Sequence, residues 1–371
     1  MESQANRDER SFRPPFCPAP KCPHHFRSHR WQWVRAGTHR RRTEPTRVQR
    51  FRCLHCGRHF SSQTFRTSYY LKRPELQEQV FRQMGACSGY RQAARVIGCA
   101  HSTVLNQARR LGRHCLLFQH LKAPPRPPSE PIVVDGFRSF EYSQYWPVDL
   151  NLAIGSENHF IEGFNHAQLR RSGTMTPRQK KKRARLEKEH GRPEPQHTRD
   201  QVETLLRRIT CGPCSFKLVS DEHHAYVQSV KRMKGWTVEH VRVNSKVART
   251  PRNPLWPANL ADLLVRHGGA NHKRETIAFS KRVQNALLRL AVFQVNRNFV
   301  EGRRVRDGSR SPSPAMLRGV MTKRLEVREV LAERLFPSRV KLPEDLREMY
   351  EEKVATRQIE NPRHHELRYA A

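Results

Sequence analysis

The sequence predicts a multidomain α/β protein, and three observations support this fold class. Cysteine, histidine and arginine are concentrated in residues 1–70, as in small modules that a metal ion holds together. Apolar residues recur at helical spacing over residues 72–121. After residue 131, β-branched runs alternate with helical patterns, which indicates an α/β domain.

Changes in composition predict the domain boundaries. We expect a cysteine-rich module at 1–70, a helical segment at 71–122, a proline-rich linker at 123–131, an α/β domain at 132–300 with a basic insertion at 166–208, and a basic helical tail at 301–371. The linker prediction depends on five prolines between 124 and 131, which cannot continue a helix and favour an extended chain.

The net charge limits the class of partner. The 371 residues include 70 Lys and Arg against 34 Asp and Glu, a formal net charge of +36, which points to a polyanion and most simply to nucleic acid. The chain has no apolar run of about 18 residues, and its start, MESQANRDER, lacks the apolar stretch of a signal peptide. We therefore expect an intracellular protein with no membrane partner.

Two cysteine pairs have the spacing of a zinc ribbon. Four residues separate Cys17 from Cys22, and two separate Cys53 from Cys56. Two such pairs can converge on one tetrahedral Zn²⁺, which substitutes for a core too small to fold alone. Two alternatives remain open at this point. The four thiols could be free, or one of four nearby histidines could replace a cysteine, namely His24, His25, His55 or His59.

Residues 90–111 have the pattern of a helix-turn-helix. A short helix meets the turn residue Gly98, and a second helix is expected to begin at an N-capping Ser102. Ala94, Val104, Ala108 and Leu111 would face inward. The polar face left exposed carries residues of the types that contact DNA bases and phosphates, which are Thr103, Asn106, Gln107 and Arg110. An ordinary helical hairpin is the alternative.

The α/β domain opens with three predicted strands. They lie in the runs IVVDGF, SFEYSQYWPVDLNLAIG and NHFIEGF. FKLVSD and TVEHVRV predict two more strands, with a helix between them in HHAYVQSVKRM. Helices are predicted at 255–267 and at 276–300, the second with Ile277 on its apolar face.

Two acids stand where predicted strands end. Asp135 ends the run IVVD and Asp221 ends KLVSD, and carboxylates at strand ends can converge on Mg²⁺ or a similar cation. Two such ions about 4 Å apart can activate a hydroxyl and stabilise the leaving oxygen of a phosphodiester. Asp262 and Glu275 are the candidates for a third acid. For each acid alone, a turn or a helix cap is the alternative.

With these features in this order, the chain resembles the DDE-type transposases of bacterial insertion sequences. The resemblance rests on the ribbon and helix-turn-helix ahead of VVDGFRSFEYSQYW, on LVSDEHHAY, and on NPLWPANLADLLVRHGGANHKRETIAFSKR. It implies an RNase H-like mixed sheet flanked by helices, with Asp135 on the first strand, Asp221 at the end of the fourth, and a third acid on the helix after the fifth. Asp262 fits that helix, although the family usually has Glu there; Glu275 is the alternative, and Glu141 and Asp149 are weaker ones.

The resemblance also implies the function. It implies a transposase that binds element ends through residues 1 to about 122, where 1–70 is a zinc-ribbon DNA-binding module. It also implies that the protein cleaves and joins DNA strands with Mg²⁺ or Mn²⁺, using water or a DNA 3′-hydroxyl as nucleophile. The expected partners are double-stranded DNA at element ends and target sites and further copies of the chain, in the bacterial cytoplasm near the nucleoid. The alternative is a transposase-derived DNA-binding regulator without catalysis. An RNA-binding or ribosome-associated protein would explain the charge but not the ordered acids.

The basic insertion is a further predicted DNA contact. Its densest run is Lys180, Lys181, Lys182 and Arg183. We expect these side chains to contact phosphates. A solvated helix with local glutamate pairs is the alternative.

Overall fold

Two β-sheets organise the fold in a computed structural model, which describes residues 8–9, 11–244, 246–273 and 276–355. The smaller sheet belongs to the N-terminal module and consists of the antiparallel strands β1 (Trp33–Arg40), β2 (Arg47–Cys53) and β3 (His59–Ser61). Short 3₁₀ turns, η1 (Pro23–His25) and η2 (Ser62–Phe65), flank it. The module has its own small core, which includes Phe51, Phe60 and Phe65.

The larger sheet has five strands in the order β6-β5-β4-β7-β8. These are β4 (Ile132–Phe140), β5 (Pro147–Gly155), β6 (Ile161–Gln168), β7 (Ser215–Asp221) and β8 (Thr237–Val243). β4, β5 and β6 pair antiparallel, while β7 lies parallel to β4 and β8 parallel to β7. All five predicted strands are confirmed, and the sheet is mixed.

Helices cover both faces of this sheet. α6 (His197–Thr210) and α7 (His224–Arg232) pack on the face that presents Ile132 and Val134. α8 (Trp256–Gly268), α9 (Val283–Val295) and α4 (His101–Lys122) share a core with the face that presents Val133. Alternate residues of one strand thus bury into different cores, because successive side chains point to opposite faces.

The long helix predicted at 276–300 begins later than expected. α9 starts at Val283 and continues into a π-turn, η3 (Asn296–Val300). Ile277 is 100% exposed and lies before the helix, so its assignment to the apolar face was wrong. The other predicted apolar positions, such as Leu287 and Leu290, are buried.

The helical segment consists of α2 (Leu76–Gly85), α3 (Tyr90–Ile97) and α4. Gly98 takes the left-handed conformation between α3 and α4 (φ 71°), and Ala94, Val104, Ala108 and Leu111 are buried, as predicted. α4 begins one residue before Ser102, after Ala100, so Ser102 lies in the first turn and does not cap the helix.

The helical segment and the sheet share one hydrophobic core, in contrast to the separate domains expected from the sequence. α4 packs so closely on α9 that a Cβ on Gly112 would lie 2.6 Å from Leu288. The proline-rich segment is fixed as well, since Arg126 donates to the carbonyl of Arg318 over 2.6 Å. The prolines end α4 but do not separate two independent bodies.

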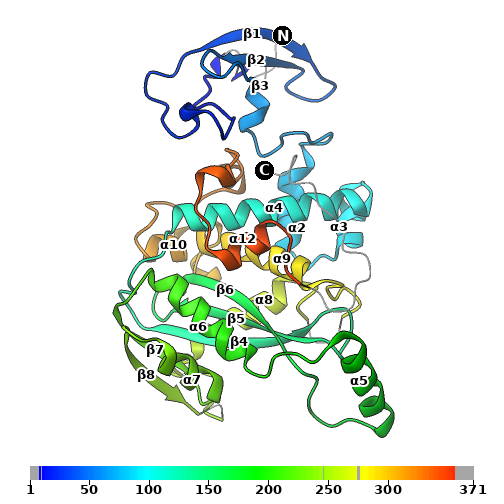
Figure 1. Cartoon of the computed structure of the whole chain (residues 1–371), viewed down its shortest axis with the longest axis vertical. Coiled ribbons are helices and arrows are strands. Elements are labelled where there is room, and N and C mark those ends of the chain that lie inside the picture. The colour runs from blue at the N-terminus through cyan, green and yellow to red at the C-terminus, as the bar shows by residue number, and fades with distance from the viewer. Residues whose placement is uncertain (1–7, 10, 245, 274–275, 356–371) are drawn as a thin grey trace.

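The basic insertion is shorter than predicted. α5 (Pro177–His190) forms within it and is capped by Thr176, and it projects away from the sheet in Figure 1. Residues 197–208, however, belong to α6, whose Val202, Leu205 and Leu206 are completely buried against the sheet. The arginines of α6 made this segment resemble the basic run before it, but its apolar residues form a stripe that covers the core.

The C-terminal residues up to 355 are part of the core, so they do not form the expected tail. They include η4 (Val305–Arg310), α10 (Pro314–Leu317), α11 (Val327–Val330), η5 (Pro337–Arg339) and α12 (Glu344–Tyr350). Val330 and Met349 enter the main core, while Phe336 enters the core of the N-terminal module. This segment therefore connects the two cores, between which it lies in Figure 1.

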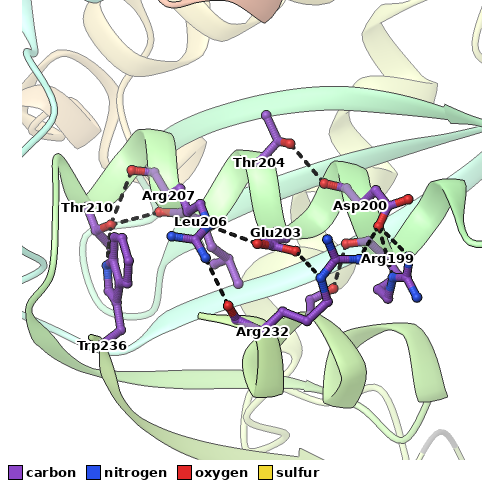
Figure 2. A network of polar contacts seen from close by, with 10 residues as sticks. Arg199, Asp200, Glu203, Thr204, Leu206, Arg207, Thr210, Arg232 and Trp236 are labelled. Atoms are coloured by element: carbon purple, nitrogen blue, oxygen red, sulfur yellow. Dashed lines mark hydrogen bonds and ion pairs between the residues drawn. The ribbon is translucent and has the colours of Figure 1, made fainter. Parts of the chain in front are cut away.

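A polar network fixes α7 against α6 (Figure 2). Arg232 of α7 lies 2.7 Å from Asp200 and 2.9 Å from Glu203. Arg207 of α6 lies 2.9 Å from Glu203 and donates to the carbonyl of Arg232. Trp236 donates to Thr210 over 3.0 Å. Because α7 directly follows the end of β7, the network holds the turn after Asp221 in place.

Candidate catalytic cleft and metal site

The three predicted aspartates line one cleft of about 920 Å³. Asp135 lies on β4 and Asp221 ends β7, and these neighbouring strands are in register at Val133 and Val219, two residues before each acid. The two aspartates therefore stand at the same level and on the same face. Asp262 reaches the cleft from α8. The sheet and one helix thus bring together acids that lie far apart in the sequence.

Helical spacing directs one side of α8 into the cleft. Asn259, Asp262, Leu263 and Arg266 line it, at intervals of three and four residues. The opposite side of α8 is fixed in the core through Ala258, Ala261 and Val265. Asp262 thus lies on the helix after the fifth strand, where the resemblance places the third acid, and its catalytic role stays a prediction.

Burial in the cleft disfavours ionisation of the aspartates. Desolvation raises the pKa of Asp135 to about 6; the nearby Asp221 and Asp149 add to the shift, and a hydrogen bond from the N–H of Gly136 opposes it. Desolvation together with Asp135 also raises the pKa of Asp262, against the effect of Arg266 and Arg249. Each acid therefore makes its neighbour harder to charge, as expected where carboxylates share a site.

The cleft aspartates lack cationic partners at ion-pair distance. Among the described residues, none of Asp135, Asp221 and Asp262 forms a salt bridge. Asp221 accepts a hydrogen bond from the N–H of His223 over 2.9 Å. The Oδ1 atom of Asp262 is buried and has no hydrogen-bond partner. Unpaired carboxylate oxygens in one cleft are the donor set that hard divalent cations prefer.

Cations surround the acids at the rim of the cleft. Those that line it are Arg138, Arg170, Arg171, Arg249, Arg266 and Lys273. Arg171 and Lys182 both approach the ring of Tyr145, with distances of 4.3 Å and 5.0 Å to its centroid. α5 is thereby attached beside the cleft. A polyanion placed there would meet acids at the floor and positive charge at the edge.

The alternative third acids have different positions. Glu275 lies outside the described residues. Glu141 is buried and accepts a hydrogen bond from the N–H of Val283 over 2.8 Å, which fixes the start of α9. Asp149 on β5 pairs in register with Arg138 and so belongs to the other face of the sheet from Asp135. Its pKa is raised, chiefly by burial.

Sequence reasoning missed the rim residues Arg249 and Arg266. Arg249 follows the last strand within a polar loop, and Arg266 occupies a helix position where an exposed arginine is ordinary. The spacing of four residues between Asp262 and Arg266 was the available signal. It becomes informative only when the face of α8 that enters the cleft is known.

The four predicted cysteines come together in the N-terminal module. The sulfur atoms of Cys17, Cys22, Cys53 and Cys56 all lie within 4.8 Å of one another and could hold a metal ion. Cys53 ends β2, and the chain turns over residues 54–56 to bring Cys56 back, with the N–H of Gly57 donating to the carbonyl of Cys53. Burial raises the pKa of Cys17. For Cys53, N–H groups of the turn and the indole of Trp31, 3.2 Å away, outweigh burial and lower the pKa to about 6.

None of the nearby histidines belongs to this cluster in the described chain. His25 is buried and is held by the carbonyl of Cys17 over 2.7 Å and by Ser338 over 2.8 Å. His24 contacts the carbonyl of Arg27 and lies edge-on to His55. Of the alternatives that the sequence left open, four cysteines are therefore the ligand set that the structure brings together.

The polar face predicted on α4 is only partly exposed. Asn106 is exposed and Thr103 is half-buried. Gln107 is only 3% exposed and donates to the carbonyl of Arg73, and Arg110 donates to the carbonyl of Thr67 over 2.8 Å. The expectation that Gln107 and Arg110 lie on an open surface was wrong, because the segment before α2 covers them.

In α5, Lys180, Lys181 and Lys182 are exposed as predicted. Arg183 is half-buried, and it donates to the carbonyl of Arg171 and lies 3.6 Å from Glu187. Both interpretations of the basic run therefore have a counterpart: three exposed lysines, of which Lys182 also lies over the ring of Tyr145, and one arginine in a local pair.

Comparison with protein families and with curated proteins found no match to this chain. Among the described helices, none combines the length and the apolar character that a membrane span requires.

Proposed function

We propose that this chain is a DDE-type DNA transposase that binds the ends of its element and catalyses metal-dependent strand cleavage and strand transfer. The observation that carries the proposal is the meeting of Asp135, Asp221 and Asp262 in one cleft, where none of them forms a salt bridge within the described part of the chain. An unpaired, buried carboxylate oxygen costs about 1–3 kcal/mol or more, so a fold retains it where a ligand uses it.

The donor set fits two divalent cations, Mg²⁺ or Mn²⁺, held by the three aspartates. When bound, these ions would lower the pKa of an attacking hydroxyl and stabilise the leaving oxygen of the phosphodiester. Asp262 offers its buried Oδ1, which has no other partner. Burial also reduces water access, which strengthens electrostatic interactions within the cleft.

In this proposal, the cations at the rim of the cleft bind the phosphates of the DNA strand. Arg138 and Arg249 are exposed at the edge and can contact phosphates on either side of the scissile bond. In cleavage, water attacks the phosphorus atom, the P–O bond to the neighbouring sugar breaks, and a 3′-hydroxyl is released. In strand transfer, that hydroxyl attacks a target phosphodiester, so one bond forms as another breaks. No covalent protein intermediate is required.

The fold supports the proposal at the level of topology. Three antiparallel strands followed by two parallel ones, with the acids on the first strand, at the end of the fourth and on the following helix, agree with an RNase H-like domain. We assign the four-cysteine cluster to a structural Zn²⁺, because four thiolates in a closed set are the usual ligands of such sites. DNA contacts by exposed Asn106 and the lysines of α5 remain part of the proposal, as does assembly of several copies on DNA.

Strand cleavage tests the proposal. The full-length protein is incubated with duplex DNA that carries the element end and with Mg²⁺ or Mn²⁺, and nicks are mapped at nucleotide resolution. Wild-type protein should cut at a defined position only when the cation is present. Asp135→Asn and Asp221→Asn should be inactive yet bind the duplex normally, while the matched control Asp307→Asn, outside the cleft, should cut normally.

The same assay separates the alternative function. A transposase-derived regulator would bind the end with all three variants and cut with none, wild type included. Full cleavage by both Asp135→Asn and Asp221→Asn, with their fold intact, would exclude the proposed mechanism.

A further inference from the structure

A second hollow, of about 830 Å³, lies on the N-terminal module, away from the carboxylate cleft. Five Lys and Arg residues line it, which are Arg41, Arg42, Arg50, Arg58 and Lys72. Of the residues that the structure describes, no Asp or Glu lines it. We call this hollow the basic groove.

The cations of the basic groove are available to a ligand. Arg42, Arg58 and Lys72 are exposed, and within the described chain none of the three side chains makes a hydrogen bond or an ion pair. The buried Glu9 of the same module, by contrast, accepts hydrogen bonds from Ser62, Gln63 and Arg66. The groove thus concentrates positive charge that the fold itself does not use.

The wall of the groove is rigidly supported. Thr67, just before the wall residues 69–72, accepts a hydrogen bond from Arg110 of α4 and donates to the carbonyl of Leu331 over 2.8 Å. Gln107 of α4 holds the carbonyl of Arg73 at the other end of the wall. Arg334 stacks over Tyr69 at 4.5 Å. A site that is already ordered before its ligand arrives loses less entropy on binding.

Gln107 and Arg110 therefore have a role different from base contact. They bind the groove wall to α4, so that the groove and the helical segment form one continuous body. Because these two side chains are covered, half of the predicted recognition face of α4 is not accessible to DNA. The groove, in contrast, presents unpaired cations.

We infer that the basic groove grips the phosphate backbone of duplex DNA without reading its sequence, an inference that rests on the proposed DNA-directed function. Charge complementarity selects a polyanion. Of the described residues that line the groove, none is an exposed Asn or Gln that could read an adenine edge, since the single amide, Gln63, is buried and bound to Arg41 and Glu9. Of the phenylalanine and tyrosine rings that line it in the described chain, only Tyr70 is largely exposed, whereas single-strand binding relies on several stacking rings.

The test compares two variants of the full-length protein that each lose three exposed cations. Arg42→Ala/Arg58→Ala/Lys72→Ala removes three of the exposed cations of the groove. Lys231→Ala/Lys234→Ala/Arg242→Ala removes three cations at α7 and β8, at the opposite end of the molecule in Figure 1. Fluorescence anisotropy measures binding to two 30-base-pair duplexes of unrelated sequence and to a 30-nucleotide single strand, between 50 and 300 mM KCl.

The groove variant should bind both duplexes at least about tenfold more weakly, and the slope of log affinity against log salt should fall by about two to three, close to one per lost phosphate contact. The control variant should keep the wild-type affinity and slope. Tyr70→Ala should change duplex affinity by less than about twofold. Circular dichroism and metal content verify that each variant is folded.

Three results would overturn the inference: wild-type affinity and slope in the groove variant, a loss confined to one of the two duplexes, or a loss confined to the single strand. The outcome is separable from that of the proposed function. If wild-type protein never cuts DNA but the groove variant loses duplex binding, the inference stands and the transposase proposal fails. If wild-type protein cuts and the groove variant binds and cuts equally well, the inference alone fails.

Discussion

The carboxylates of the cleft and those of the α6–α7 network are the same chemical group in opposite surroundings. In the network, Asp200 and Glu203 are each held by arginines at 2.7–2.9 Å (Figure 2). In the cleft, Asp135 and Asp262 have no such partner, although Arg249 and Arg266 line the same space. With 70 Lys and Arg against 34 acids, partners are plentiful in this chain. Under the proposed function, the acids of the network hold the fold together, and the acids of the cleft bind a cation.

The largest expected effect concerns the third acid. Asp262→Asn should lower the rate of strand cleavage by at least about a thousandfold, because a two-metal site loses an anionic ligand. Glu275→Gln should keep the rate within about threefold of wild type. The rates are measured with end-labelled duplex and Mn²⁺. An inactive Glu275→Gln together with an active Asp262→Asn would make Glu275 the third ligand. That result would contradict the claim that Asp262 is unpaired because it binds a cation.

The next effect concerns the cysteine cluster. Its four thiolates differ from the carboxylates of both regions because one metal ion can bind them all. Cys53→Ser/Cys56→Ser in the full-length chain should abolish stoichiometric zinc and unfold the N-terminal module, since structural zinc contributes about 10 kcal/mol in small zinc-finger peptides. Elemental analysis and limited proteolysis measure both. Retained zinc would rule out the proposed ligands. The full chain is needed because Phe336 and Ser338 contact this module.

The pH dependence of stability sharpens the comparison. The folded-state pKa of Asp135, about 6, lies above the ordinary 3.8, so the protonated carboxyl favours the folded state and this contribution is lost as pH rises from about 4 to about 6. Asn cannot ionise, so Asp135→Asn should gain up to about 3 kcal/mol relative to wild type over that window. Urea unfolding without added divalent cations measures this. A constant difference between the two proteins would contradict the assignment.

The smallest expected effects are changes in the free energy of unfolding, which should have opposite signs for the cleft acids and for the acids of the α6–α7 network. Asp262→Asn should stabilise the cation-free protein by about 1–3 kcal/mol, because a buried, unpaired charge is removed. Asp200→Asn should destabilise it by about 0.5–1 kcal/mol, because its ion pairs with Arg199 and Arg232 are partly exposed. Thermal unfolding of both variants provides the comparison. Equal signs would show that pairing does not distinguish the two groups.

Features that depend on residues close together in the sequence could be predicted, and features that depend on contacts between distant residues could not. The strands, the cysteine set, Asp135 and Asp221 could be predicted because each depends on a local pattern: alternating β-branched runs, close cysteine pairs and acids at strand ends. Asp262 followed only from the resemblance, with Glu275 left open as the alternative. The burial of Gln107 and Arg110 could not, because it depends on residues 67–73 folding back over α4. The same holds for the C-terminal segment, whose Phe336 fills a core more than 270 residues earlier in the chain.

That the cleft aspartates form no salt bridge within the described residues could likewise not be predicted from the sequence. Lysine and arginine are frequent in this chain, and only the fold decides which acids they pair with. α8 places Arg266 four residues after Asp262, yet the guanidinium lies over the ring of Phe137, 5.4 Å from its centroid. Long-range geometry thus keeps the acid free.

The central claim is that the cleft aspartates remain unpaired in order to bind divalent cations, and Mn²⁺ binding tests it most directly. Electron paramagnetic resonance at pH 7.5 counts the Mn²⁺ bound by wild-type protein, by Asp221→Asn and by the network control Asp200→Asn. The account predicts at least one Mn²⁺ per chain in wild type and in Asp200→Asn, and loss of that binding in Asp221→Asn. Equal Mn²⁺ binding in all three proteins, or none in wild type at millimolar Mn²⁺, would contradict it.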